Sequence, residues 1–330
     1  MLSPYRVLDL TDERGELASL ILGDLGADVI KVEPPEGSSS RRLPPLLDGA
    51  PDGERSLHYF AFNRNKRAVT LDLTSAAGRE ELLRQAAGAD FLFESSSPGA
   101  LAALGLGFED LRRVNPRLVY VAITPYGQDG PYAKFAGTDL TLSATGGQMA
   151  LQGDADRPPV RITVPQVWLH ASSEAAVASL VAHARMLQTG EAQFVDVSCQ
   201  ASVVWTMMQG MVAHAIQGWD FNRAGGILQL GTISFPLVYE CADGYVVAAP
   251  NGATLQKMVP WFVEDGITPK EWIGGEEWAT YDIRLLQRQP LAYSLDEVLD
   301  ATRRYLKGHT KDQLMDRGLR EGVTIAPVNT

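Results

Sequence analysis

Residues 7–33, VLDLTDERGELASLILGDLGADVIKVE, decide the fold. The segment Val7–Leu10 predicts a short strand, and Thr11 or Asp12 is a suitable N-cap for the helical stretch that follows. Asp28–Glu33 predicts a second strand. A strand, a helix and a strand within so short a span indicate a βαβ unit, in which the two strands lie parallel in one sheet.

Further apolar runs extend this pattern along the chain. Strands are predicted at 68–73, 91–93 and 118–123, with helical stretches between them. Residues 139–219 are expected to be mainly helical, apart from a strand at 194–197. Strands with little polar alternation, separated by amphipathic helices, are typical of a parallel sheet covered on both faces. The predicted fold class is therefore α/β with a Rossmann-like sheet.

The pattern changes in the last third of the sequence. Two β-rich runs, 235–241 and 245–249, flank an Ala-Asp-Gly turn and predict a β-hairpin. The helical stretches after this hairpin are more polar than the earlier ones. We place a domain boundary at the glycine-containing turn near residues 222–227. This boundary gives a large Rossmann-like domain at 1–222 and a smaller α+β domain at 223–330.

Composition and charge narrow the choice of partners. The 330 residues are 45% hydrophobic and 21% charged, with a net charge of −11, and such an acidic chain repels nucleic-acid backbones. The two cysteines, Cys199 and Cys241, match no metal or redox spacing and suit a reducing compartment. The N-terminus does not resemble a signal peptide, and no apolar stretch is long enough to span a bilayer. The expected location is the cytoplasm.

Four common site types do not fit this sequence. The turn after the first predicted strand, residues 10–15, is acidic and holds a single glycine, so the glycine fingerprint of NAD-binding proteins is missing. The five histidines are scattered without carboxylates at ligand spacing, which argues against a metal site. Neither a G-x-S-x-G elbow nor a phosphate-binding Walker loop occurs.

Three basic or glycine-rich segments suit an anionic ligand. Arg41 and Arg42 follow the second predicted strand, and residues 63–67, NRNKR, precede the third. A glycine-rich loop at 126–132 follows the fifth. In an open α/β sheet, ligands bind near strand ends, where arginine and lysine can contact phosphate groups. The order of these segments along the chain also matches a known protein family.

Read in order, the sequence resembles CoA-transferase family III, the group of the carnitine dehydratase-like proteins, formyl-CoA transferase and α-methylacyl-CoA racemase. FNRNKRAVTLDL resembles the family's N-R-x-K-R-S-x-x-L-D-L signature, and ESSSPG resembles E-N-F-x-P-G. The resemblance covers nearly the whole chain. The matching segments are 7–37, 62–73, 94–132, 158–165, 189–198, 239–249 and 322–330.

The resemblance implies a particular architecture and a particular type of substrate. Family members have a Rossmann-like large domain and a smaller domain, and two chains thread through each other as an interlocked dimer. They act on acyl-CoA and carboxylate substrates and use neither NAD nor a metal. Family chains usually continue past the segment P-V-N-T and return to the large domain, whereas this sequence stops at Thr330.

Several family positions carry over to this sequence. Arg42 falls on the family's CoA-binding arginine, and Lys66 falls on a lysine near the ADP phosphates. Asp139 falls on the acid of the G-x-D/E segment. Thr138 lies where many transferases have tyrosine and the racemases have their catalytic histidine, so the racemase pair is absent. The implied CoA-binding set is Arg14, Arg42, Lys66, Arg67, Ser95, Ser96 and Thr138.

The largest departure from the family concerns the nucleophile. The family pattern V-P-x-x-D places an aspartate at the start of a long helix, where it attacks the acyl-CoA thioester. Here Trp168 occupies that position, and an indole cannot act as the nucleophile. His170 and Glu174 lie about 200° and about 240° around the helix from Trp168. Both should point away from the face that Trp168 occupies, so we reject them as replacements.

Three hypotheses follow. The first is a CoA-transferase subunit without a nucleophile that acts with an Asp-bearing paralogue as a heterodimer. The second is a homodimeric acyl-CoA enzyme of altered chemistry, with Asp139 as its acid or base. The third is a non-catalytic pseudoenzyme that binds CoA. A neighbouring gene for an Asp-bearing paralogue would favour the first, a homodimer with ordered CoA the second, and an occluded CoA channel the third.

Overall fold

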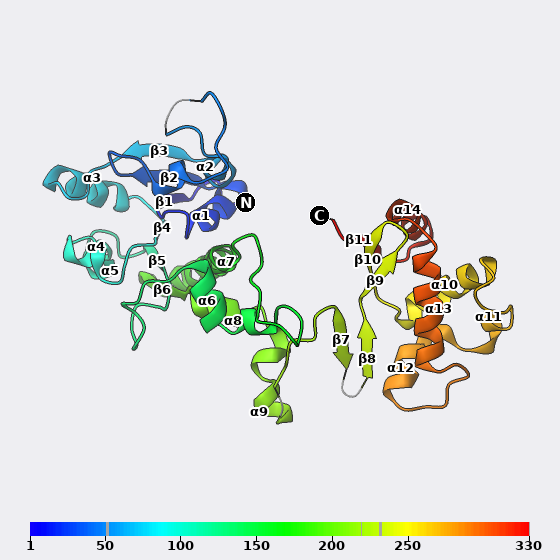
Figure 1. Cartoon of the computed structure of the whole chain (residues 1–330). Coiled ribbons are helices and arrows are strands. Elements are labelled where there is room, and N and C mark those ends of the chain that lie inside the picture. The colour runs from blue at the N-terminus through cyan, green and yellow to red at the C-terminus, as the bar shows by residue number, and fades with distance from the viewer. Residues whose placement is uncertain (51–52, 219, 231–232, 330) are drawn as a thin grey trace. The chain divides into compact units, whose positions relative to one another are not determined.

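The computed structural model describes residues 1–330 except 51–52, 219, 231–232 and 330. The chain forms two compact units (Figure 1). The first unit comprises Met1–Gln152 and Pro159–Phe221, and the second comprises Gly153–Pro158 and Asn222–Thr330. Among the described residues, no helix is long and apolar enough to cross a membrane.

A six-stranded sheet forms the centre of the first unit. Its strand order is β3-β2-β1-β4-β5-β6, and all of the pairs are parallel. The predicted parallel α/β sheet is therefore confirmed. The third strand ends three residues earlier than predicted, and residues 71–73 instead form the loop beyond it. The strands are β1 (Arg6–Leu10), β2 (Asp28–Glu33), β3 (Arg67–Thr70), β4 (Phe91–Glu94), β5 (Val119–Thr124) and β6 (Gln193–Ser198).

Helices cover both faces of this sheet because successive strand residues point to opposite sides. Val7 and Phe91 pack against α1 and α7 in one apolar core, whereas Leu8 and Leu92 pack against α3 and α5 in another. The helices are α1 (Glu16–Asp24), α2 (Leu57–Asn63), α3 (Ala76–Ala86), α4 (Ala100–Ala103), α5 (Phe108–Val114), α6 (Asp139–Thr145), α7 (Val167–Thr189), α8 (Cys199–Trp205) and α9 (Ala213–Gln217). Short 3₁₀ turns are η1 (Ser39–Arg42), η2 (Gln148–Leu151) and η3 (Met208–Met211).

The first helix begins later than predicted. Its N-cap is Gly15, which has no side chain to cap it, so the prediction of Thr11 or Asp12 as the cap is wrong. Thr11 is engaged elsewhere, because its backbone N–H and its hydroxyl both donate to Asp9 Oδ1, at 2.9 and 2.6 Å. Asp12 is likewise engaged, by Arg14 and Ser95. The β1–α1 loop is thus held by side-chain bonds.

The second unit combines antiparallel strands with helices. The predicted hairpin is present as β9 and β10, although residues 235–236 belong to the preceding strand β8. The core of the second unit contains Trp261, Phe262 and Tyr305. The strands are β7 (Ile227–Leu230), β8 (Ile233–Pro236), β9 (Val238–Cys241), β10 (Gly244–Ala248) and β11 (Ile325–Pro327). The helices are α10 (Gly252–Glu264), α11 (Trp272–Gly275), η4 (Trp278–Thr280), α12 (Tyr281–Leu286), α13 (Leu295–Lys307) and α14 (Lys311–Glu321).

Candidate functional site

A crevice opens at the carboxyl edge of the sheet in the first unit. The strand order reverses between β1 and β4, and the end of β1 and the loops after β2, β3 and β4 meet around a cavity of about 400 Å³. Leu10, Leu71 and Leu73 give this cavity an apolar wall, while Glu33 and Ser96 add polar groups. In open α/β sheets, ligands bind at this switch point. The crevice therefore offers an apolar wall and polar groups together.

The segment after β2 carries two arginines in different surroundings: Arg41 is held by hydrogen bonds, and Arg42 is exposed to solvent. Arg41 donates to Glu33 Oε2 through Nε at 2.6 Å and to Oε1 through Nη2 at 2.7 Å, and its guanidinium lies 4.0 Å from the centre of the Tyr59 ring. Burial raises the pKa of Glu33, but the hydrogen bonds from Arg41, Ser38 and Tyr59 outweigh it and lower this pKa to about 2. Arg42 is exposed, and its Nη1 donates to the carbonyl of Glu36 at 3.3 Å. Arg42 therefore has no ion pair with an acidic residue that the structure describes, unlike Arg41.

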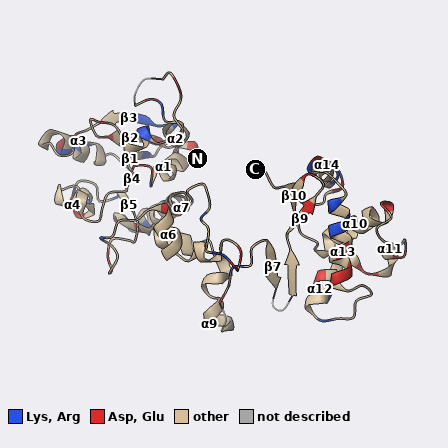
Figure 2. Ribbon diagram, in the orientation of Figure 1, with Lys and Arg blue, Asp and Glu red and all other residues tan. Residues whose placement is uncertain are grey.

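Lys and Arg residues gather around β2, β3 and α2 (blue in Figure 2). Lys66 is one of these residues, but its side chain lies in a buried ionic cluster. Its side chain is 1% exposed. Nζ donates to Asp9 Oδ2 at 2.9 Å, to the carbonyl of Glu16 at 2.8 Å and to Asn63 Oδ1 at 3.0 Å. An ammonium group has three donors, so none is left for a phosphate in this conformation. The geometry gives Lys66 a structural role and does not support the predicted contact with the ADP phosphates.

The other predicted CoA-binding residues divide into two groups. Ser95 Oγ donates to Asp12 Oδ1 at 2.9 Å, and Arg14 Nε donates to the same oxygen at 2.8 Å. Arg14 and Ser95 therefore join the loops after β1 and β4 at the carboxyl edge, where Ser96 lines the crevice. Arg67 lies elsewhere, because it begins β3 and makes two hydrogen bonds to Asp28, the first residue of β2. Asp28 marks the amino edge of the sheet.

The start of α7 is held by Asp139. This carboxylate is buried, and its Oδ1 accepts the backbone N–H groups of Gln166 at 2.7 Å and Val167 at 3.0 Å. A carboxylate at a helix N-terminus satisfies free amides and complements the helix dipole. Thr138 caps the short helix α6 that begins with Asp139. Trp168 is the second residue of α7, half-buried against the core, so its predicted place in the first helical turn is confirmed.

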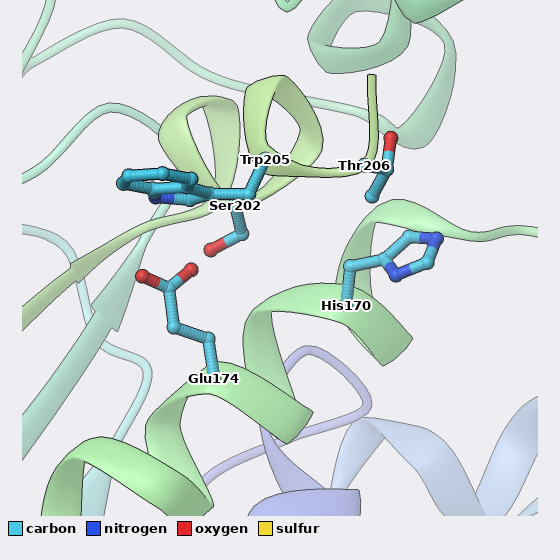
Figure 3. A pocket seen from close by; sticks show the side chains of 5 residues that line it. All are labelled: His170, Glu174, Ser202, Trp205 and Thr206. Carbon is cyan, nitrogen blue, oxygen red and sulfur yellow. The ribbon is translucent and has the colours of Figure 1, made fainter. Parts of the chain in front are cut away.

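A separate cavity of about 360 Å³ lies between α7 and α8. His170 and Glu174 line it together with Ser202, Trp205 and Thr206, while Trp168 does not. Figure 3 shows the Glu174 carboxylate directed toward Ser202 and His170 beside Thr206. The two residues therefore line a cavity to which Trp168 does not contribute. The i,i+4 spacing of His170 and Glu174 places both side chains on one face of α7, and this spacing is the signal in the sequence for the cavity.

The strand order and the crevice where it reverses define a doubly wound, Rossmann-type fold. The chain belongs to CoA-transferase family III, because the sequence model of that family matches residues 2–330. Proteins of this family use CoA thioesters as substrates and act on acyl-CoA and carboxylate groups. Within the described residues, no group of three or more His, Cys, Asp or Glu side chains is arranged to hold a metal ion.

Individual relatives agree with this assignment. The chain is 34% identical over 334 residues to succinyl-CoA:(R)-benzylsuccinate CoA-transferase subunit BbsE of Thauera aromatica, covering 99% of this chain and 78% of the relative. It is 31% identical over 303 residues to human succinyl-CoA:glutarate CoA-transferase, covering 90% of this chain and 66% of the relative. A crystal structure of a CAIB/BAIF family protein from Brucella suis matches with a TM-score of 0.77 and 30% identity, over 99% of this chain and 83% of that one.

Proposed function

We propose that this protein binds an acyl-CoA thioester in the first unit and takes part in moving CoA between carboxylic acids as the subunit without a nucleophile. The observation that carries this proposal is the crevice at the carboxyl edge, with its apolar wall and the exposed Arg42 on the adjoining segment. The adenine ring would lie against Leu10, Leu71 and Leu73. The domain predicted at 1–222 would then be the CoA-binding domain, and 223–330 the smaller one.

Arg42 is the residue whose loss tests CoA binding most directly. Arg41 is held by Glu33, and Lys66 has no remaining donor, so Arg42 would contribute the main charge-assisted contact to a phosphate. Such a contact contributes roughly 1.5–3 kcal/mol, which is about tenfold or more in affinity. Calorimetric titration of CoA should show this loss for Arg42→Ala. Arg84→Ala removes an exposed arginine on α3 that is paired with Glu81, away from the crevice, and should leave the affinity unchanged.

The absent nucleophile supports a two-chain enzyme. Trp168 stands where the family pattern V-P-x-x-D has its aspartate, and the helix start at this position is intact. An indole offers one N–H donor and no carboxylate to attack a thioester. The relative from Thauera is named as a subunit, which supports a partner chain for this protein as well. An Asp-bearing paralogue would then supply the nucleophile.

Exposed apolar side chains support an extensive interface. Val177 and Val181 on α7 are 64% and 66% exposed, and Trp205, Met208 and Ile216 further along the chain are 62–75% exposed. Large apolar groups gathered in this way mark interaction surfaces. An interlocked dimer would cover them, and obligate interfaces of that kind exceed roughly 2,000 Å². Sedimentation at low micromolar concentration should show a dimer, and a stable folded monomer would contradict this part of the proposal.

An adduct experiment separates the three hypotheses. The chain alone, incubated with succinyl-CoA and analysed by mass spectrometry, should carry no acyl or CoA adduct and show no turnover. Together with an Asp-bearing paralogue it should turn over, with the adduct on the partner's aspartate. Turnover by the chain alone, with an adduct on another side chain, would favour a homodimer of altered chemistry. CoA binding without turnover in either assembly would favour the pseudoenzyme.

The homodimer hypothesis needs Asp139 as an acid or base, and the geometry of this residue suits positioning better. Its Oδ1 already accepts two backbone N–H groups at the start of α7, and Arg161 Nη1 lies 3.7 Å from Oδ2. Protonating this carboxylate would remove the charge that caps the helix. We therefore assign Asp139 a positioning role in the proposed function.

A further inference from the structure

A second cavity in the first unit, of about 200 Å³, is lined by residues of β4, β5 and β6, of α4 and α5, and by Gln128 in the loop after β5. It adjoins the crevice, since Leu101 lines both cavities. Glu94, Tyr120 and Phe194 face it from the three strands, and Phe108 faces it from α5. No part of the proposed CoA chemistry uses these residues. The cavity therefore needs an explanation of its own.

Three aromatic rings form its apolar wall. The ring centres of Phe108 and Phe194 lie 5.4 Å apart, those of Tyr120 and Phe194 lie 5.7 Å apart, and those of Phe108 and Tyr120 lie 6.0 Å apart. Tyr120 is buried, whereas Phe194 is 43% exposed and lies at the surface. Mutually tilted rings at these distances present both faces and edges to a ligand. This wall favours a planar ring as the occupant.

Two polar groups remain available to an occupant. Glu94 is buried, and its carboxyl group accepts the Ser96 N–H at 2.6 Å and the Tyr120 hydroxyl at 3.4 Å, which leaves further lone pairs. Gln128 Nε2 is buried and has no hydrogen-bond partner among the described residues. A buried amide donor without a partner costs free energy, so a bound acceptor would stabilise it. The cavity thus offers a donor and an acceptor together.

The remaining charged groups do not suit an anion. Glu109 and Asp110 also line the cavity, but they pair with Arg112 at 2.7 Å and with Arg113 at 3.0 Å. Neither arginine is among the lining residues, and no lysine is either. A carboxylate or phosphate would meet the Glu94 carboxyl group, and the cations nearest to the wall, Arg112 over the Phe108 ring and Arg113, are already paired with acidic residues. An uncharged ligand fits these surroundings.

We propose that this cavity is a binding site for a small, uncharged planar ring with an amide-type edge, as in an aromatic carboxamide or a nucleobase. The ring would pack against Phe108, Tyr120 and Phe194. Its acceptor would take the free N–H of Gln128, and its N–H would donate to Glu94. The volume is below the roughly 300–1,000 Å³ of sites for larger ligands, so a single ring suits it. This site does not depend on CoA binding.

Benzamide is a direct probe of this site, and benzoate is its matched anion. Ligand-observed NMR titration of the full chain should show benzamide binding at least tenfold more tightly than benzoate. Gln128→Leu keeps the side-chain size and removes the donor, and it should weaken benzamide binding at least fivefold. Gln85→Leu on α3 removes an amide outside the cavity and should leave the affinity unchanged.

A second variant guards against misfolding of the first. Ala102 is exposed and lines the cavity, so Ala102→Phe should fill the space without disturbing the core and should abolish benzamide binding. Circular dichroism confirms that each variant is folded. Absence of benzamide binding to the unmodified protein would overturn the proposal. Equal binding of benzoate, or undiminished binding by Ala102→Phe, would overturn it as well.

Discussion

Two buried carboxyl groups on neighbouring strands have opposite surroundings. Asp9 lies on β1 and Glu94 on the adjacent strand β4, where Glu94 pairs with Leu10, the residue after Asp9. Both acids are almost fully buried. Burial raises the pKa of Asp9, but Lys31 and Lys66 outweigh it and hold this pKa well below its ordinary value. Burial also raises the pKa of Glu94, to about 7, and the weaker effects of Ser96, Tyr120 and Arg14 do not cancel it.

The difference teaches that counter-charge, more than burial, decides what a buried acid does in this sheet. Asp9 lies with Glu16, Lys31 and Lys66, which makes two negative and two positive groups within one buried cluster. The ion pairs fix these four side chains relative to one another, so the cluster holds the β1–α1 loop in place. Glu94 faces an aromatic cavity and changes its protonation near neutral pH. The first group supports the fold, and the second is available to a ligand.

Breaking the cluster should have the largest effect. Lys66→Met leaves two buried carboxylates, Asp9 and Glu16, with Lys31 as the one buried cation of this cluster. Removing one partner of a buried ion pair lowers the free energy of unfolding by about 3–5 kcal/mol. Arg67→Met removes the adjacent, exposed cation, whose pair with Asp28 contributes below about 1 kcal/mol. Calorimetric unfolding of the two variants measures the contrast. Equal losses would show that the cluster does not stabilise the first unit.

The sequence predicted the sheet well and this cluster not at all. Apolar runs such as 118–123 mark buried parallel strands because both faces of the sheet are covered, and that signal is local. Lys66 stands in a basic, surface-like run, and its burial depends on Asp9, 57 residues earlier in the chain. Such compensation between distant charges leaves no periodic trace in the sequence.

The candidate site shows the same limit. The resemblance implies CoA-binding roles for Arg42 and Ser96; Ser96 lines the crevice, and Arg42 contacts the carbonyl of Glu36, which also lines it. The same reasoning could not distinguish Arg67, whose side chain turns to Asp28 at the amino edge. Gln128 drew attention only as part of a glycine-rich loop. Its unpartnered amide becomes visible once β4, β5 and β6 are brought together.

The next largest effect is expected in the pH dependence of stability, which tests the contrast between Asp9 and Glu94 directly. The folded-state pKa of Glu94 is about 7 against an ordinary value of 4.5, so the folded protein binds more protons between these values and loses stability as pH rises through them. The loss is roughly 3 kcal/mol at about 1.4 kcal/mol per pKa unit. Glu94→Gln removes this titration, so its stability relative to the unmodified protein should rise by about that amount from pH 4 to pH 8.

Asp9→Asn is the control with the opposite sign. The pKa of Asp9 is lowered in the folded state, so its charge stabilises the fold above its ordinary pKa of 3.8, and this contribution is lost as pH falls toward the folded-state value. The variant should therefore be less stable than the unmodified protein at pH 8, and the deficit should shrink toward acid pH. Denaturant unfolding at each pH gives both differences. A stability difference for Glu94→Gln that stays constant with pH would contradict the raised pKa of Glu94.

Tyr120→Phe should have the smallest effect, because it removes one long hydrogen bond and keeps the aromatic wall. The Tyr120 hydroxyl donates to Glu94 Oε1 at 3.4 Å, and this bond favours the ionised carboxylate. At pH 8 its loss should cost about 0.5–1.5 kcal/mol, the usual contribution of one hydrogen bond. At pH 5 Glu94 is protonated and the cost should be smaller. A double-mutant cycle with Glu94→Gln isolates the coupling between the two side chains. The same loss at both pH values, in both backgrounds, would mean that Tyr120 supports the core through its hydroxyl without acting on Glu94.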